Sequence, residues 1–75
     1  MENKYVYLVL DENINAILGV YSTYEGAVER MFIYMDGFSM EDSEHTDEDT
    51  SKFYFVDGVL GEEVCITIRK EMVRP

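Results

Sequence analysis

Residues 22–37 read STYEGAVERMFIYMDG, and they contain the start, the buried stripe and the end of a single helix. Ser22 is followed three residues later by Glu25, the capping-box pattern that satisfies two free backbone N–H groups. Apolar residues then recur at three- and four-residue spacing, as on the buried face of a helix: Tyr24, Ala27, Val28, Met31, Phe32 and Met35. Gly37 stands where a residue of left-handed conformation commonly ends a helix. The pattern predicts a helix over residues 23–36.

The second half of this helix is apolar around much of its circumference. Ile33 and Tyr34 fall beside or off the buried stripe. Either the chain itself packs there, through the segment that follows or through a bent sheet edge, or a partner covers these side chains.

Four strand-like segments flank the helix, two before it and two after it: residues 4–10, 16–22, 52–56 and 63–70. The first is almost continuously apolar, and the turn residues DENIN separate it from the second. The last two flank DGVLGE, whose two glycines suit a hairpin. In the final segment Val64, Ile66 and Ile68 alternate with polar residues, which predicts a sheet with one covered face.

This order of elements predicts an α+β fold. We expect an antiparallel sheet of about four strands with one helix packed across it, in ββαββ order, and an acidic connection over residues 37–51. A chain of 75 residues is too short for two independent cores, so residues 1–75 form a single domain. With 47% hydrophobic residues, including six Tyr and four Phe, it has enough apolar mass to fold.

The overall charge excludes several classes of partner. Sixteen Asp and Glu against six Lys and Arg give a net charge of −10, which disfavours direct binding to nucleic acid or to an anionic membrane. One cysteine, Cys65, permits no internal disulfide and indicates a reducing compartment. The start of the chain lacks a signal-peptide pattern, and no apolar run reaches membrane-spanning length. We expect a cytoplasmic protein.

Much of the negative charge lies in residues 40–51, MEDSEHTDEDTS, which hold six carboxylates and no basic residue. Such a segment can be a solvated linker, a metal loop or a protein-binding surface. An EF-hand register that begins at Asp42 puts Asp47 where Gly is needed and Phe53 where the bidentate Glu is needed. His45 has no His or Cys at ligand spacing, which argues against zinc. We therefore predict no metal and no cofactor.

No catalytic constellation is evident either. Paired carboxylates act as acid and base when burial tunes one of them, and the carboxylates here lie in polar sequence. Cys65 lies within a predicted strand and His45 twenty residues away, with no third group to orient them. There is no glycine-rich phosphate loop. We predict a protein that is not an enzyme.

Residues 19–31, GVYSTYEGAVERM, follow the strand YVYLVL and resemble the hairpin-to-helix unit of small phage and bacterial proteins of unknown function. The resemblance covers about half of the chain and extends to FYFVDG, residues 53–58. It implies a small, compact cytoplasmic protein of viral origin and carries no catalytic residues. The acidic segment departs from this pattern.

The charge leads to a functional hypothesis: an ordered acidic surface that mimics DNA. Closely spaced carboxylates can occupy the basic nucleic-acid-binding groove of a host defence or nucleic-acid-processing protein, so the chain would be a phage or mobile-element inhibitor. The predicted contacts are Asp36, Glu41, Asp42, Glu44, Asp47, Glu48 and Asp49, with Tyr34 and Phe38 as apolar anchors. The alternative is an accessory domain that self-associates, for example as a homodimer, through sheet edges or the apolar helix face, with acidity serving solubility.

Overall fold

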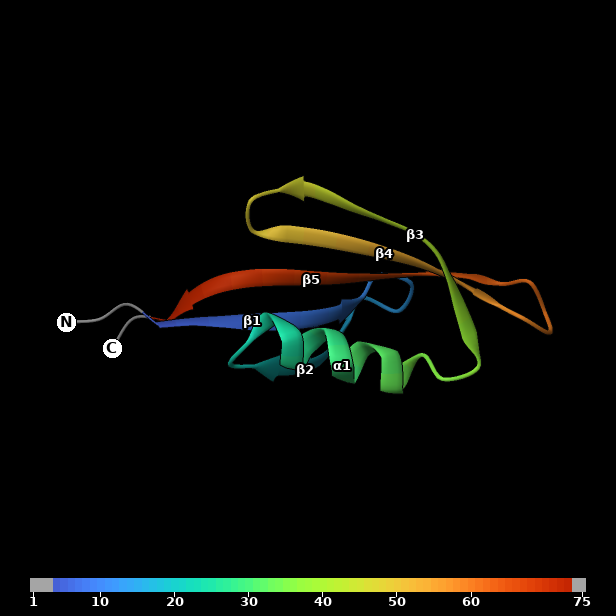
Figure 1. Cartoon of the computed structure of the whole chain (residues 1–75), viewed down its shortest axis with the longest axis horizontal. Coiled ribbons are helices and arrows are strands. Elements are labelled where there is room, and N and C mark those ends of the chain that lie inside the picture. The colour runs from blue at the N-terminus through green and yellow to red at the C-terminus, as the bar shows by residue number, and fades with distance from the viewer. Residues whose placement is uncertain (1–3, 74–75) are drawn as a thin grey trace.

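The computed structural model describes residues 4–73, which form one five-stranded antiparallel sheet with a single helix against it (Figure 1). The elements are β1 (Lys4–Asp11), β2 (Ala16–Tyr21), α1 (Tyr24–Tyr34), β3 (Phe38–Asp47), β4 (Thr50–Asp57) and β5 (Glu63–Val73). The strand order is β2-β1-β5-β4-β3, so β5 is central and β2 and β3 are the edges.

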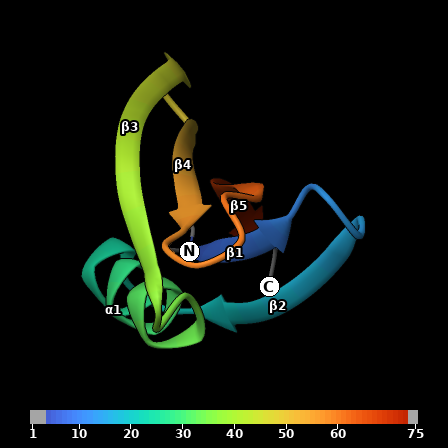
Figure 2. The ribbon, with the colours of Figure 1, turned by 90° about the vertical axis from the view of Figure 1, so that its right-hand side faces the viewer.

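The sheet is long and strongly twisted. The chain extends over 49 × 21 × 21 Å. Viewed down the long axis, β3 and β4 rise away from β1 and β2, and α1 lies at the base of the structure beside β2 and the start of β3 (Figure 2). The helix packs on β1, β2 and β5. Most of β3 therefore extends beyond the part of the sheet that the helix covers.

The prediction of about four strands in ββαββ order is wrong, because a fifth strand lies inside the predicted acidic connection. Residues 38–47 of that segment form β3, which pairs antiparallel with β4 from Phe38 opposite Asp57 to Asp47 opposite Thr50. Nine of the ten residues of β3 are exposed, so neither face of this strand is buried. A strand with no buried face has no reason to alternate, so hydrophobic periodicity cannot detect it.

The helix is shorter than predicted, and its N-cap is a different residue. Thr23 is the cap, and its side chain accepts a hydrogen bond from the backbone N–H of Gly26 at 3.0 Å. The predicted Ser22–Glu25 capping box is therefore wrong, and Gly26, three residues after the actual cap, has no side chain to complete a box there. The helix ends at Tyr34, and Gly37 then adopts a φ of +91°, as expected for a glycine that ends a helix.

The core lies between α1 and the strands beneath it. Its buried side chains are Val9, Ala27, Met31, Met35, Phe53, Phe55, Ile66 and Ile68. The predicted helix stripe is confirmed for Ala27, Met31 and Met35. Phe32 is half-exposed and forms a T-shaped contact with Phe55, with ring centroids 5.9 Å apart. Ile33 and Tyr34 are at least half-exposed, so the chain leaves this side of the helix open.

Among residues 4–73, no helix is long and apolar enough to cross a bilayer.

The cap supplies a test of where the helix begins. We expect Thr23→Ala to lower the free energy of unfolding by about 1 kcal/mol, because the Gly26 N–H loses its acceptor. Ser22→Ala is the matched control and should have little effect. Denaturant unfolding of both variants measures the difference. A larger loss for Ser22→Ala would place the cap one residue earlier.

An acidic groove on the face opposite the helix

The uncovered face of the sheet is where side chains from three strands meet. Phe53, Phe55, Ile66 and Ile68 point into the core, so the residues between them point away from the helix. Asp42 on β3 pairs with Tyr54 on β4, and Tyr54 pairs with Cys65 on β5. These three residues form one row across the sheet.

This row lies in a groove of about 520 Å³, within the size range of natural ligand pockets. Its lining consists of Asn13, Glu41, Asp42, Glu44, Tyr54, Phe55, Val56, Glu63, Val64 and Cys65. Four of these residues are carboxylates and none is Lys or Arg. The lining of the groove therefore carries an excess of negative charge.

Tyr54 ties the acidic strand to the middle of the groove. Its hydroxyl donates a hydrogen bond of 2.7 Å to Oε1 of Glu44. This bond, together with burial and the charges of Glu44, Cys65 and Asp42, raises the pKa of Tyr54 to about 12. Burial also raises the pKa of the Cys65 thiol, which makes it a poor nucleophile at neutral pH. The groove offers fixed negative charge rather than a reactive thiolate.

The turn between β1 and β2 closes one end of the groove. The side chain of Asn13 donates to the carbonyl of Glu63 at 2.9 Å and accepts from the N–H of Cys65 at 3.3 Å, so it continues the β5 ladder where β1 ends. Beside it, Glu12 accepts a hydrogen bond of 2.8 Å from the Thr67 hydroxyl. These bonds hold the turn against β5.

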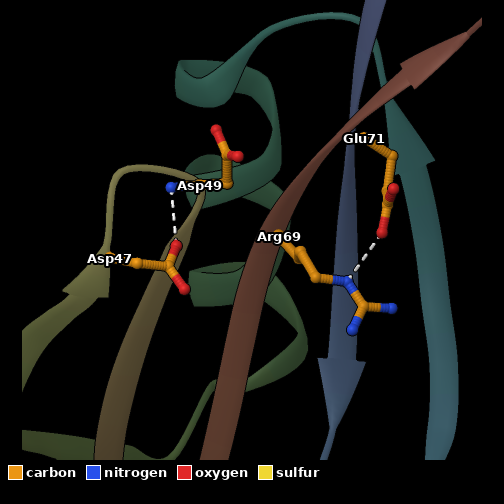
Figure 3. A network of polar contacts seen from close by, with 4 residues as sticks. All are labelled: Asp47, Asp49, Arg69 and Glu71. Atoms are coloured by element: carbon orange, nitrogen blue, oxygen red, sulfur yellow. Dashed lines mark hydrogen bonds and ion pairs between the residues drawn. The ribbon is translucent and has the colours of Figure 1, made fainter.

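A second group of predicted contacts lies elsewhere, in the turn between β3 and β4. Asp47, Glu48 and Asp49 share a shallow hollow with Arg69 and Lys70. Asp47 accepts a hydrogen bond from the Asp49 backbone N–H, while Arg69 pairs with Glu71 on its own strand at 2.9 Å (Figure 3). These two basic groups weaken the field of the three carboxylates, whereas one basic residue, Lys52, lies opposite Glu44 beside the groove.

The remaining predicted residues lie apart from both groups. Asp36 borders a hollow at the end of the helix with Phe32 and Ile33. Tyr34 is half-exposed, and its hydroxyl donates to Asp11 at 3.4 Å. Phe38 is partly buried and packs against the core. Of the predicted contacts, Glu41, Asp42 and Glu44 line the groove, and Asp47, Glu48 and Asp49 lie together in the β3–β4 turn.

Sequence reasoning missed several groove residues, although one signal was available. Alternation along β4 and β5 places Tyr54, Cys65 and Glu63 on the same face, away from the core. Two apolar residues in the β4–β5 turn were also missed: Val59 is 90% exposed and Leu60 is 70% exposed. Asp57 accepts hydrogen bonds from the backbone N–H groups of both, which fixes the turn that presents them.

His45 has a structural contact. A hydrogen bond of 2.8 Å joins its Nδ1 to Oγ of Ser51. Ser51 is only 6% exposed. The pair anchors β3 to β4 and leaves the hydroxyl inaccessible to a substrate. Within residues 4–73, no three His, Cys, Asp or Glu side chains converge as metal ligands would.

Comparison with known proteins finds no matching family model, no matching curated protein and no matching solved structure.

The bond between Tyr54 and Glu44 can be tested by alkaline titration. Phenolate absorbance should show one tyrosine that ionises near pH 12, and Glu44→Ala should move this titration toward the ordinary value of 10.0. Because the folded state holds this proton more tightly, the bond's contribution to stability is present below pH 10 and is lost as the pH rises to about 12. An unchanged titration in Glu44→Ala would exclude the bond.

Proposed function

We propose that this protein is a non-enzymatic binding protein that docks the acidic face of β3, β4 and β5 against a basic, nucleic-acid-binding protein. The observation that carries the proposal is the groove, with four carboxylates and no cation among its lining residues. A cationic side chain of a partner would meet a net negative charge there, although Lys52 on β4 pairs with Glu44 across the ladder, whereas the carboxylates of the β3–β4 turn lie beside both Arg69 and Lys70.

The spacing of the carboxylates supports mimicry of a nucleic acid backbone. Residues on one face of a strand repeat every ~6.6–6.8 Å, as Asp42 and Glu44 do. A row of carboxylates along one line of a strand presents repeated negative charge, as the phosphates of a DNA strand do. Because β3 is paired to β4 along its length, the backbone that carries these charges is held in a strand rather than in a loose chain.

The β4–β5 turn adds an apolar contact to this charged face. Val56 and Glu63 line the groove and lie at the two ends of the turn that carries Val59 and Leu60. Exposed apolar side chains in a fixed turn lose little entropy when a partner covers them, so they suit the role of anchors. They take the place that the sequence assigned to Tyr34 and Phe38.

The proposed biological setting is inhibition of a host defence or nucleic-acid-processing protein by a phage or mobile element. This part of the proposal rests on the resemblance of residues 19–31 to small phage proteins and on the sign of the charge. A net charge of −10 repels nucleic acid and favours fast, salt-dependent association with a basic partner.

A pair of triple variants with equal charge changes tests the groove. Glu41→Gln, Asp42→Asn and Glu44→Gln remove three groove charges but retain hydrogen-bond acceptors. Asp47→Asn, Glu48→Gln and Asp49→Asn remove three charges from the turn. Immobilised protein is incubated with a bacterial lysate at low salt, and captured proteins are then challenged with duplex DNA. We expect the groove variant to lose about tenfold or more in affinity for a DNA-displaceable partner, and the turn variant to lose less.

Two outcomes would contradict the proposal. One is equal capture by the wild type and the groove variant. The other is a set of captured proteins that duplex DNA does not displace, because a mimic and the nucleic acid it imitates must compete for one groove.

A further inference from the structure

The two edges of the sheet differ sharply in charge. Edge strand β3 has exposed carboxylates and two bulges, near Glu41 and near Thr46. Charges and bulges are the usual means by which an edge strand avoids pairing with another chain. The other edge, β2, carries no charged residue, because its sequence is AILGVY, and it has one bulge, at Leu18, where β3 has two.

The absence of charge extends well beyond β2. Residues 13–24, NINAILGVYSTY, contain no Asp, Glu, Lys or Arg, in a chain of which 29% is charged. The nearest carboxylate on the adjacent strand, Asp11, is buried and accepts hydrogen bonds from Asn13 and Tyr34. The edge is thus neutral over its whole length.

The backbone of β2 is available for pairing. On one side it pairs with β1, from Tyr21 opposite Tyr7 to Ala16 opposite Asp11. No hydrogen bond found within residues 4–73 engages its other side. Figure 2 shows this outer side of β2 facing away from the rest of the sheet. An exposed row of N–H and C=O groups is a template for a further strand.

Apolar side chains accompany this free backbone. Ile17 is 63% exposed and Val20 is 55% exposed. They pair with Leu10 and Leu8 of β1, which are half-buried on the face away from the helix. A strand added to β2 would cover these two side chains and extend the apolar surface across the junction.

From these features we propose that the protein forms a two-fold symmetric dimer, in which the β2 strands of two copies pair antiparallel and join the two sheets into one of ten strands. A pairing centred between Leu18 and Gly19 sets Ile17 of each copy opposite Val20 of the other. The proposal stands on β2 alone and does not depend on the proposed function of the groove.

The chain's own charge selects a second copy and limits the assembly to two. Copies of charge −10 repel one another, so they approach best where charge is absent. Pairing of β3 with β3 would oppose carboxylates, and pairing of β2 with β3 would bury carboxylates against Ile17 and Val20. Only pairing of β2 with β2 avoids both of these costs. A two-fold contact uses the same strand of each copy, so no third copy can join through it. Three strands separate β2 from β3, so the acidic edges lie at the two ends of the dimer.

Two identical substitutions at exposed valines test the dimer. Val20→Lys puts a charge on the β2 edge, whereas Val59→Lys makes the same change in the β4–β5 turn. Both reduce the net negative charge equally, so any general effect of charge is shared. In sedimentation equilibrium we expect a wild-type dimer, a dissociation constant raised about tenfold or more by Val20→Lys, and no weakening by Val59→Lys. Circular dichroism checks that both variants are folded.

Hydrogen exchange locates the interface independently. Amides of β2 should become more protected as protein concentration rises, and amides of β3 should not. A wild type that stays monomeric at millimolar concentration would overturn the proposal, as would a dimer that Val20→Lys leaves unchanged. Dissociation of the dimer by added salt would also overturn it, because salt screens the repulsion between copies and should favour an uncharged contact. The groove triple variant should remain dimeric, so the two proposals can fail separately.

Discussion

Pairing of β5 with both β1 and β4 is the constraint on which the rest of the structure depends. The β1–β5 ladder runs from Lys4 opposite Val73 to Asp11 opposite Ile66, and the β4–β5 ladder uses the other side of the same strand. Ile66 and Ile68 of β5 are completely buried beneath the helix. The hairpin of β1 and β2 and the hairpin of β3 and β4 therefore join into one sheet only through the last strand of the chain. Forming this sheet requires closure of nearly the full chain length, which local sequence patterns do not encode.

The sequence predicts those helices and strands that have one buried face, because burial makes their apolar residues recur at a regular spacing. The helix stripe at Ala27, Met31 and Met35 and the alternation of Ile66 and Ile68 are confirmed because each has a core to face. β3 could not be predicted on this basis, since its backbone bonds to β4 hold it in place and its side chains face solvent. The cap was misplaced because Ser22 and Thr23 are both good caps, and residue type alone does not choose between them.

The candidate site could be predicted in composition but not in shape. The density of carboxylates in residues 40–51 correctly marks β3 as acidic, yet the strand divides them. Those at the β3–β4 turn lie beside basic residues of β5, and only pairing with β4 and β5 brings Glu41, Asp42 and Glu44 together with Glu63. Glu63 is far from them in sequence, so no local pattern could join it to the group. The segment predicted as an acidic connection thus contains a strand, β3, that forms one side of the groove.

The separation of charge between the two edges gives the proposed dimer a functional consequence. Two copies joined at β2 would place their acidic faces at opposite ends of one continuous sheet, because three strands separate β2 from β3 in each copy. A partner with two basic grooves, or two partners on one nucleic acid site, could then be engaged at once. The second contact becomes intramolecular, and its effective concentration depends on whether the rigid sheet matches the spacing of the basic grooves. A sheet cannot adjust its length as a flexible linker can, so it would discriminate among basic proteins by the distance between their grooves as well as by their charge.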